Sequence, residues 1–162
     1  MAKLKLIGLG QRLRGDDGLG LAVVEAWQAA NPKQSTIVEV SCFESPGLTL
    51  LEELKSCPAV LIVDAIRSAG RPGQIYRLDQ NDLASFGPAA ASAHGIGVAE
   101  TISLGRSLYP GQMPPQIQFI GIEAGSVQVG QPLSQAAKSA IPQAVRVVES
   151  ALEELLAEGV SA

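Results

Sequence analysis

Two aspartates and one histidine have the residue types and positions that suit metal chemistry. Asp17 follows the first apolar run, Asp64 ends the most hydrophobic run, and His94, the only histidine, precedes a helical pattern. Ligands of open parallel sheets bind at the carboxyl edge, where side chains that follow different strands converge. Two carboxylate oxygens and one imidazole nitrogen suit a divalent first-row metal such as zinc, nickel, cobalt or manganese, with one coordination position left for water or substrate.

Each of these residues also has a structural interpretation. Asp16 or Asp17 could cap a helix, because a carboxylate there accepts hydrogen bonds from the first turn. Consecutive helical residues point about 100° apart, so one of the two aspartates would face a site while the other caps. Asp64 could be a turn or capping residue, and His94 a structural residue at the start of a helix. The sequence leaves both interpretations open.

The glycines after the first apolar run do not complete a nucleotide-binding motif. The segment Gly8–Gly10 begins like a dinucleotide fingerprint, but Leu13 stands where the third glycine is required. Residues 10–15 have the glycine spacing of a phosphate loop, but Asp16 and Asp17 stand where that loop needs Lys and Ser or Thr. Two carboxylates at those positions would repel a phosphate.

A serine or cysteine nucleophile is not indicated either. The sequence lacks a G-x-S-x-G motif. Cys42 and Cys57 form no C-x-x-C pair, so we expect both to be reduced and mostly buried. Glu123, at the end of the last predicted strand, either supports the site indirectly or caps the loop that follows. Trp27 and Phe119 are expected in the core.

Short apolar runs alternate with helical patterns, which is typical of a parallel sheet covered by helices. Strands are predicted at 3–10, 36–42, 59–64 and 116–123, with an antiparallel edge strand at 74–78. Helices are predicted at 19–30, 47–55 and 98–108, with a final helix that begins at or before Pro142 and ends near Gly159. Residues 79–93 are predicted to be a mobile connection with at most a short helix. The pattern therefore predicts an α/β three-layer sandwich, with a twisted, mostly parallel sheet of about five strands flanked by helices on both faces.

Length, charge and hydropathy limit the function classes. The 162 residues, 46% hydrophobic and 17% charged, fit a single domain over residues 1–162. A formal net charge of -4 argues against binding to nucleic acid or to an anionic membrane surface. Gly8 and Gly10 interrupt the first apolar run far short of a signal sequence or a spanning helix, so we expect a cytoplasmic protein.

Four segments together resemble the sequence motifs of the hydrogenase maturation proteases: 6–10, 13–20, 63–65 and 92–94. These endopeptidases trim the C-terminal extension from the large-subunit precursor of nickel-iron hydrogenases. The Asp-Asp-Gly-Leu-Gly run at 16–20, joined to Asp64-Ala65 and His94, is the specific part of the match. The resemblance covers nearly the whole chain and implies a twisted, mostly parallel sheet flanked by helices.

The resemblance also implies that Asp17, Asp64 and His94 are both metal ligands and catalytic residues. It implies that they recognise nickel already inserted in the precursor, so that nickel arrives with the substrate, while zinc or another divalent metal could bind to the isolated protein. Either a carboxylate or a metal-polarised water would attack the peptide carbonyl, and the sequence leaves both open. The expected partner is the precursor, and the expected state is a monomer. The alternative is a non-catalytic nickel-binding or chaperone module for hydrogenase assembly.

Two segments depart from the pattern of that family. Gln11 stands where the family often has Asn, and residues 43–47 read Phe-Glu-Ser-Pro-Gly where many members have a glycine- and threonine-rich turn. The second segment is expected at the same sheet edge as the candidate site. We therefore expect it to influence which hydrogenase is recognised.

Overall fold

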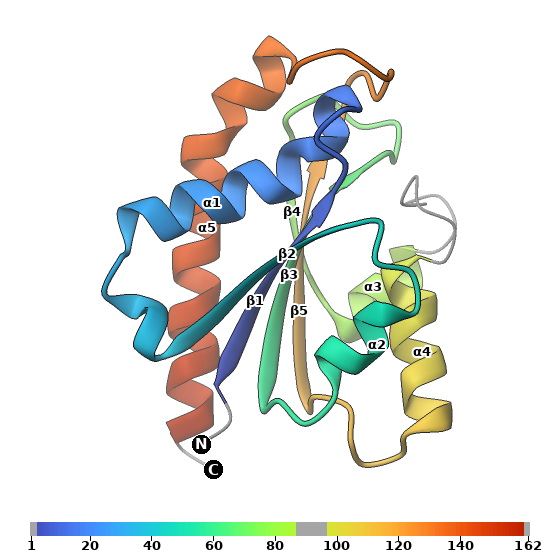
Figure 1. Cartoon of the computed structure of the whole chain (residues 1–162), viewed down its shortest axis with the longest axis vertical. Coiled ribbons are helices and arrows are strands. Elements are labelled where there is room, and N and C mark those ends of the chain that lie inside the picture. Colours follow the sequence, from blue (N-terminus) through green and yellow to red (C-terminus); the bar gives the residue numbers. More distant parts are fainter. Residues whose placement is uncertain (1–2, 87–96, 161–162) are drawn as a thin grey trace.

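The computed structural model describes residues 3–86 and 97–160, which form one five-stranded sheet with helices on both faces (Figure 1). The strands are β1 (Leu4–Gly10), β2 (Val38–Glu44), β3 (Ala59–Ile66), β4 (Ile75–Asp79) and β5 (Gln116–Glu123). The helices are α1 (Leu19–Ala30), α2 (Thr49–Leu54), α3 (Gln80–Phe86), α4 (Val98–Leu108) and α5 (Gln135–Val160). Two short 3₁₀ helices, η1 (Gly15–Gly18) and η2 (Gln34–Thr36), precede α1 and β2.

The strand order β2-β1-β3-β5-β4 confirms a mostly parallel sheet. Strands β2, β1, β3 and β5 are parallel, with Gly8 opposite Val63 and Val63 opposite Ile120. Strand β4 lies antiparallel to β5 at the edge, as predicted, although β3 is the strand that precedes it in sequence. The carboxyl ends of the four parallel strands therefore lie at one edge of the sheet, where ligands of such folds bind.

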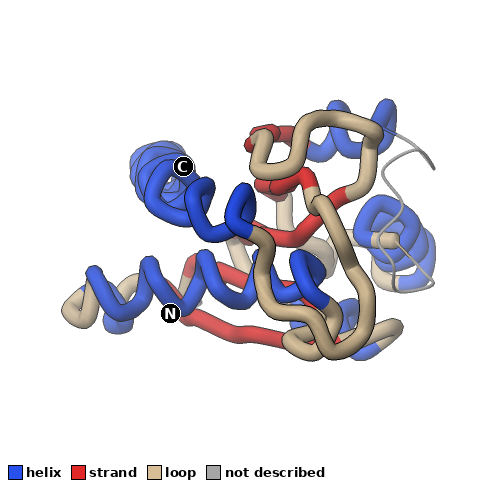
Figure 2. Tube along the Cα trace, turned by 90° about the horizontal axis from the view of Figure 1, so that it is seen from above, coloured by secondary structure: helices blue, strands red, loops and turns tan. Residues whose placement is uncertain are grey.

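Two separate hydrophobic clusters fill the space between the sheet and its helices. One cluster joins Leu61 of β3 to Trp27 of α1 and Leu152 of α5. The other joins Ile62 of β3 to Ile102 of α4 and to residues of α2 and α3. Seen from above, the strands lie between α5 on one side and α4 on the other (Figure 2). The predicted three-layer α/β architecture is confirmed, as is the core position of Trp27.

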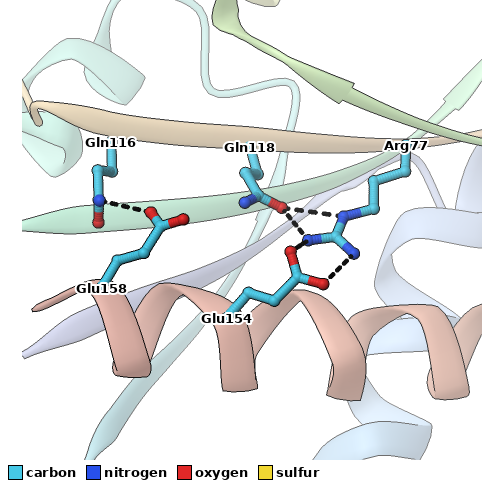
Figure 3. A network of polar contacts seen from close by, with 5 residues as sticks. All are labelled: Arg77, Gln116, Gln118, Glu154 and Glu158. Atoms are coloured by element: carbon cyan, nitrogen blue, oxygen red, sulfur yellow. Dashed lines mark hydrogen bonds and ion pairs between the residues drawn. The ribbon is translucent and has the colours of Figure 1, made fainter.

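Polar side chains attach the C-terminal half of α5 to β4 and to the first residues of β5 (Figure 3). The guanidinium of Arg77 donates to Gln118 of β5, at 3.1 Å from Nε, and to Glu154 of α5, at 3.1 Å from Nη1. Gln116 donates to Glu158, one turn further along α5, at 2.6 Å. These exposed polar contacts add to the apolar packing of α5 against the sheet.

Four element boundaries or environments can be compared with the predictions. Strand β3 continues to Ile66, because its last residues still pair with β5, so Asp64 lies two residues before the end of the strand and is not its last residue. Helix α5 begins at Gln135, before Pro142 as predicted, but Pro142 then lies in the helix interior and not in its first turn, where proline is favoured. Cys57 is buried but Cys42 is exposed, because β2 is an edge strand whose outward residues reach solvent. The predicted connection at 79–93 begins with the last residue of β4 and contains the seven-residue helix α3, which agrees with the prediction of at most a short helix. Residues 87–93 lie outside the described residues.

Within the two described ranges, none of the helices is both long enough and apolar enough to cross a membrane.

Candidate functional site

Gly20 brings the first turn of α1 against the carboxyl ends of β1 and β3. A Cβ atom at Gly20 would lie 2.3 Å from the carbonyl oxygen of Leu9, 2.4 Å from that of Val63 and 3.0 Å from the Cα of Asp64. Only glycine permits this approach, because real side chains do not come so close to backbone atoms. Asp17, three residues before Gly20, therefore lies at the same sheet edge as Asp64.

The backbone of Asp17 is fixed by its neighbours in the loop after β1. Its N–H donates to the carbonyl of Arg14 at 3.0 Å, and its carbonyl accepts from the N–H of Gln11 at 3.1 Å. Gly10 has φ 155°, and a Cβ there would lie 2.1 Å from the carbonyl oxygen of Asp17. The loop thus holds Asp17 in one position relative to the end of β1.

Asp17 and Asp64 are both buried, with only 2% and 1% of their surfaces exposed. Burial of an ionised carboxylate costs free energy unless other groups compensate it. Two such residues at the carboxyl edge of a parallel sheet are typical of a functional site. Carboxylate oxygens in this position could bind a divalent cation, whose attraction to them is stronger away from bulk water.

Asp16, the neighbour of Asp17, has a structural environment. Its side chain is fully buried, and its carboxylate accepts hydrogen bonds from the N–H of Gly125 at 2.8 Å and from the N–H and hydroxyl of Ser134 at 2.6 and 2.7 Å. The hydroxyl of Ser134 also accepts from the N–H of Ala137, as an N-cap of α5 does. The prediction that one of the two aspartates caps the helix that follows them is therefore wrong, because the N-cap of α1 is Gly18 and no side chain caps it. Asp16 instead anchors Ser134, the residue that caps α5.

Glu123 holds the connection that follows β3. It is 2% exposed and accepts hydrogen bonds from the N–H of Ser68 at 2.9 Å and from its hydroxyl at 2.6 Å. The prediction that Glu123 caps the loop after β5 is wrong, because its carboxylate accepts from the loop after β3. The end of β5 thereby fixes the chain just beyond the strand that carries Asp64.

The two segments in which the sequence departs from the family motifs are in contact. The side-chain amide of Gln11 donates to the hydroxyl of Ser45, and the N–H of Arg12 donates to Glu44 at 2.8 Å. The guanidinium of Arg12 also pairs with Glu25, and this hydrogen bond raises the pKa of Arg12. The loops after β1 and β2 are thus joined beside the candidate site.

His94 lies outside the described residues, so its predicted part in the site remains a prediction. Among the residues that are described, no three or more His, Cys, Asp or Glu side chains are grouped closely enough to hold a metal ion. Two of the three predicted ligands, Asp17 and Asp64, lie at one sheet edge. The hydrogen bonds of Asp16 could not be predicted from the sequence, because its partners are more than 100 residues away.

Comparison with known proteins gives a consistent result. A family model described as "Hydrogenase maturation protease" (HycI) matches residues 23–151. Two relatives have the name "Hydrogenase expression/formation protein HupD". The one from Thiocapsa roseopersicina is 27% identical over 162 residues, covering 99% of this chain and 71% of its own. The one from Rhizobium leguminosarum bv. viciae is 26% identical over 161 residues, covering 98% and 77%. The structure of the hydrogenase maturating endopeptidase HybD from E. coli superposes with a TM-score of 0.80 at 25% identity, covering 94% of this chain and 93% of that one.

Proposed function

Because this chain belongs to the hydrogenase maturation protease family, we propose that it is an endopeptidase that removes the C-terminal extension of a nickel-iron hydrogenase large-subunit precursor after nickel insertion. The observation that carries the proposal is the common position of the buried Asp17 and Asp64 at the carboxyl edge of the sheet. We assign both residues, together with His94, to recognition of the nickel that the precursor carries. The partner is the precursor itself.

The proposed chemistry depends on ligand type and burial. Ionised carboxylates and a neutral imidazole are ligands that suit nickel, and they must be deprotonated to bind it. Nickel bound by them would supply Lewis-acid polarisation of the peptide carbonyl or of a water molecule. Asp17 and Asp64 would hold the cation at the sheet edge, where the backbone hydrogen bonds of Asp17 fix its main chain. Both attacking groups, a carboxylate or a water, are compatible with this arrangement.

Mass spectrometry of the precursor tests this proposal. The nickel-loaded precursor is expected to lose a C-terminal peptide on incubation with the protein, while the nickel-free precursor keeps its mass. Asp17→Asn, Asp64→Asn and His94→Ala are each expected to abolish the cleavage. Glu153→Gln on the exposed face of α5 is the matched control and retains it. Cleavage that survives in any two of the three site variants contradicts the site assignment.

The same experiment distinguishes a protease from a non-catalytic binding module. Complex formation between the wild-type protein and the loaded precursor, with no change in precursor mass, would contradict the protease function and favour a non-catalytic nickel-binding or chaperone module. We also propose that the protein acts as a monomer in the cytoplasm, which the mass in solution and cell fractionation test. Metal analysis of the purified protein tests whether zinc or another divalent metal binds in the absence of substrate.

A further inference from the structure

Three exposed apolar side chains lie on loops at the end of the sheet that carries the candidate site. Within the described ranges, five large hydrophobic residues are more than half exposed: Leu13 and Val129 at 75% each, Leu108 at 56%, Leu48 at 53% and Ile37 at 51%. The first two and Leu48 lie on loops that follow parallel strands. Ile37 comes directly before β2, and Leu108 ends α4, which leads to the start of β5. The most exposed members are therefore at the carboxyl edge.

Leu13 and Val129 are held next to each other by main-chain contacts. The N–H of the peptide bond that joins Val129 to Gly130 donates to the carbonyl of Leu13 at 2.7 Å. A second hydrogen bond joins the same two loops, from the N–H of Gly15 to the carbonyl of Gln131 at 3.0 Å. These bonds fix the main chain of the two loops at the positions from which the apolar side chains extend. A main chain that is already ordered loses little conformational entropy when it binds a partner.

The same pair of loops continues to the candidate site. The N–H of Asp16 donates to the carbonyl of Ser126 at 2.8 Å, and the Asp16 carboxylate accepts hydrogen bonds from Ser134. The next residue is Asp17, four positions after Leu13. A polypeptide that reaches the carboxylate of Asp17 therefore comes close to the exposed apolar pair.

We propose that Leu13 and Val129 bind the substrate protein, by packing against an apolar side chain of the large-subunit precursor near the cleaved bond. This inference rests on the proposed function. The occupant is the precursor and not a second copy of this chain, because the pair is continuous with a site that must receive a polypeptide. Two side chains also expose far less surface than the roughly 800 Å² that each partner of a stable complex buries. An apolar contact of this size suits a transient encounter between protease and substrate.

Steady-state cleavage of the nickel-loaded precursor tests the inference. Leu13→Ser and Val129→Ser together are expected to raise KM about tenfold and to leave kcat unchanged, because central apolar anchors contribute binding energy without taking part in the reaction. Ile37→Ser and Leu108→Ser at the opposite end of the sheet are the matched controls, with unchanged KM. Leu13→Met keeps the size and hydrophobicity of the side chain and is expected to retain the wild-type KM.

The outcomes separate this inference from the proposed function. A KM equal to that of the two control variants overturns the inference, as does a lowered kcat at unchanged KM. A wild-type dimer that the double Ser variant converts to monomer, measured by sedimentation, also overturns it in favour of a second copy as the occupant. If the wild-type protein binds the precursor without cleaving it, the protease function fails. In that case, a Kd of the double variant that is roughly tenfold higher than that of the wild type still supports binding of the precursor by Leu13 and Val129.

Discussion

Ser134 donates two hydrogen bonds to the carboxylate of Asp16 across 118 residues of sequence, one from its N–H and one from its hydroxyl. The same hydroxyl accepts from Ala137 in the first turn of α5. The start of the C-terminal helix and the loop that carries Asp17 are therefore fixed by one buried carboxylate. A change at Asp16 should affect both the stability of the fold and the position of its neighbour.

Replacement of Asp16 by alanine is expected to lower the free energy of unfolding by about 3 kcal/mol, because its donors lose their charged acceptor in a buried position. Asp16→Asn keeps one carbonyl oxygen as an acceptor and should cost less. Ser134→Ala removes only the hydroxyl, and about 1 kcal/mol is expected. Urea denaturation measures all three, and a loss below about 1 kcal/mol in Asp16→Ala would contradict the structural role of this carboxylate.

In contrast to Asp16→Ala, the variants Asp17→Asn and Asp64→Asn are expected to lower activity with little change in stability. Each should lower the rate of precursor cleavage by about 100-fold or more, because the negative charge that attracts the metal is lost. The midpoint of urea denaturation should change little, since the amide is similar in size to the carboxylate. Circular dichroism and denaturation of the same samples supply the check. A loss of activity that only follows a loss of folded protein would show a structural role instead.

The two cysteines should react at different rates, because Cys42 is exposed on the edge strand and Cys57 is buried. One thiol per chain is expected to react with a chromogenic disulfide reagent in the native protein, and two in denaturant. The surrounding protein removes part of the hydration of Cys42 and raises its pKa, so little thiolate is present at neutral pH. The native reaction at pH 8 should therefore be slower than that of free cysteine. A variant Cys42→Ser that still reacts rapidly would contradict this assignment.

Arg77 gives Glu154 a pH-dependent role in attaching α5 (Figure 3). The hydrogen bond from Arg77 lowers the pKa of Glu154. A carboxylate whose pKa is lower in the folded state stabilises the fold above its ordinary pKa, and this contribution is lost as the pH falls through the lowered value. Glu154→Gln should thus be less stable than the wild type at pH 7, with the difference absent at a pH below both values. High salt should reduce the difference, because the pair is exposed. A difference that persists at low pH would contradict the ionic origin.

Much of the fold and part of the site could be predicted from the sequence. Alternation of apolar runs and helical patterns predicts the parallel sheet, because a strand covered on both faces is almost entirely apolar, as β3 is. The carboxyl ends of parallel strands share one edge, which is why Asp17 and Asp64 were expected near each other. The contact of Asp16 with Ser134 could not be predicted, since it depends on how the loop before α5 crosses the sheet edge. The exposure of Cys42 depends on strand order. It could not be predicted, because an apolar run in the sequence does not show whether its strand is central or at the edge of the sheet.

Gly20→Ala tests the close approach that brings α1 to the site. A methyl group there would lie within 2.4 Å of two carbonyl oxygens and 3.0 Å from the Cα of Asp64, so the helix or β3 must move. A loss of about 2 kcal/mol or more in the free energy of unfolding is expected, together with reduced precursor cleavage. Gly159→Ala is the matched control, because a Cβ at Gly159 meets nothing within 4 Å and alanine favours the helix, so this variant should be neutral or more stable. Equal stability of the two variants in urea denaturation would show that the first turn of α1 does not need glycine to reach the strand that carries Asp64.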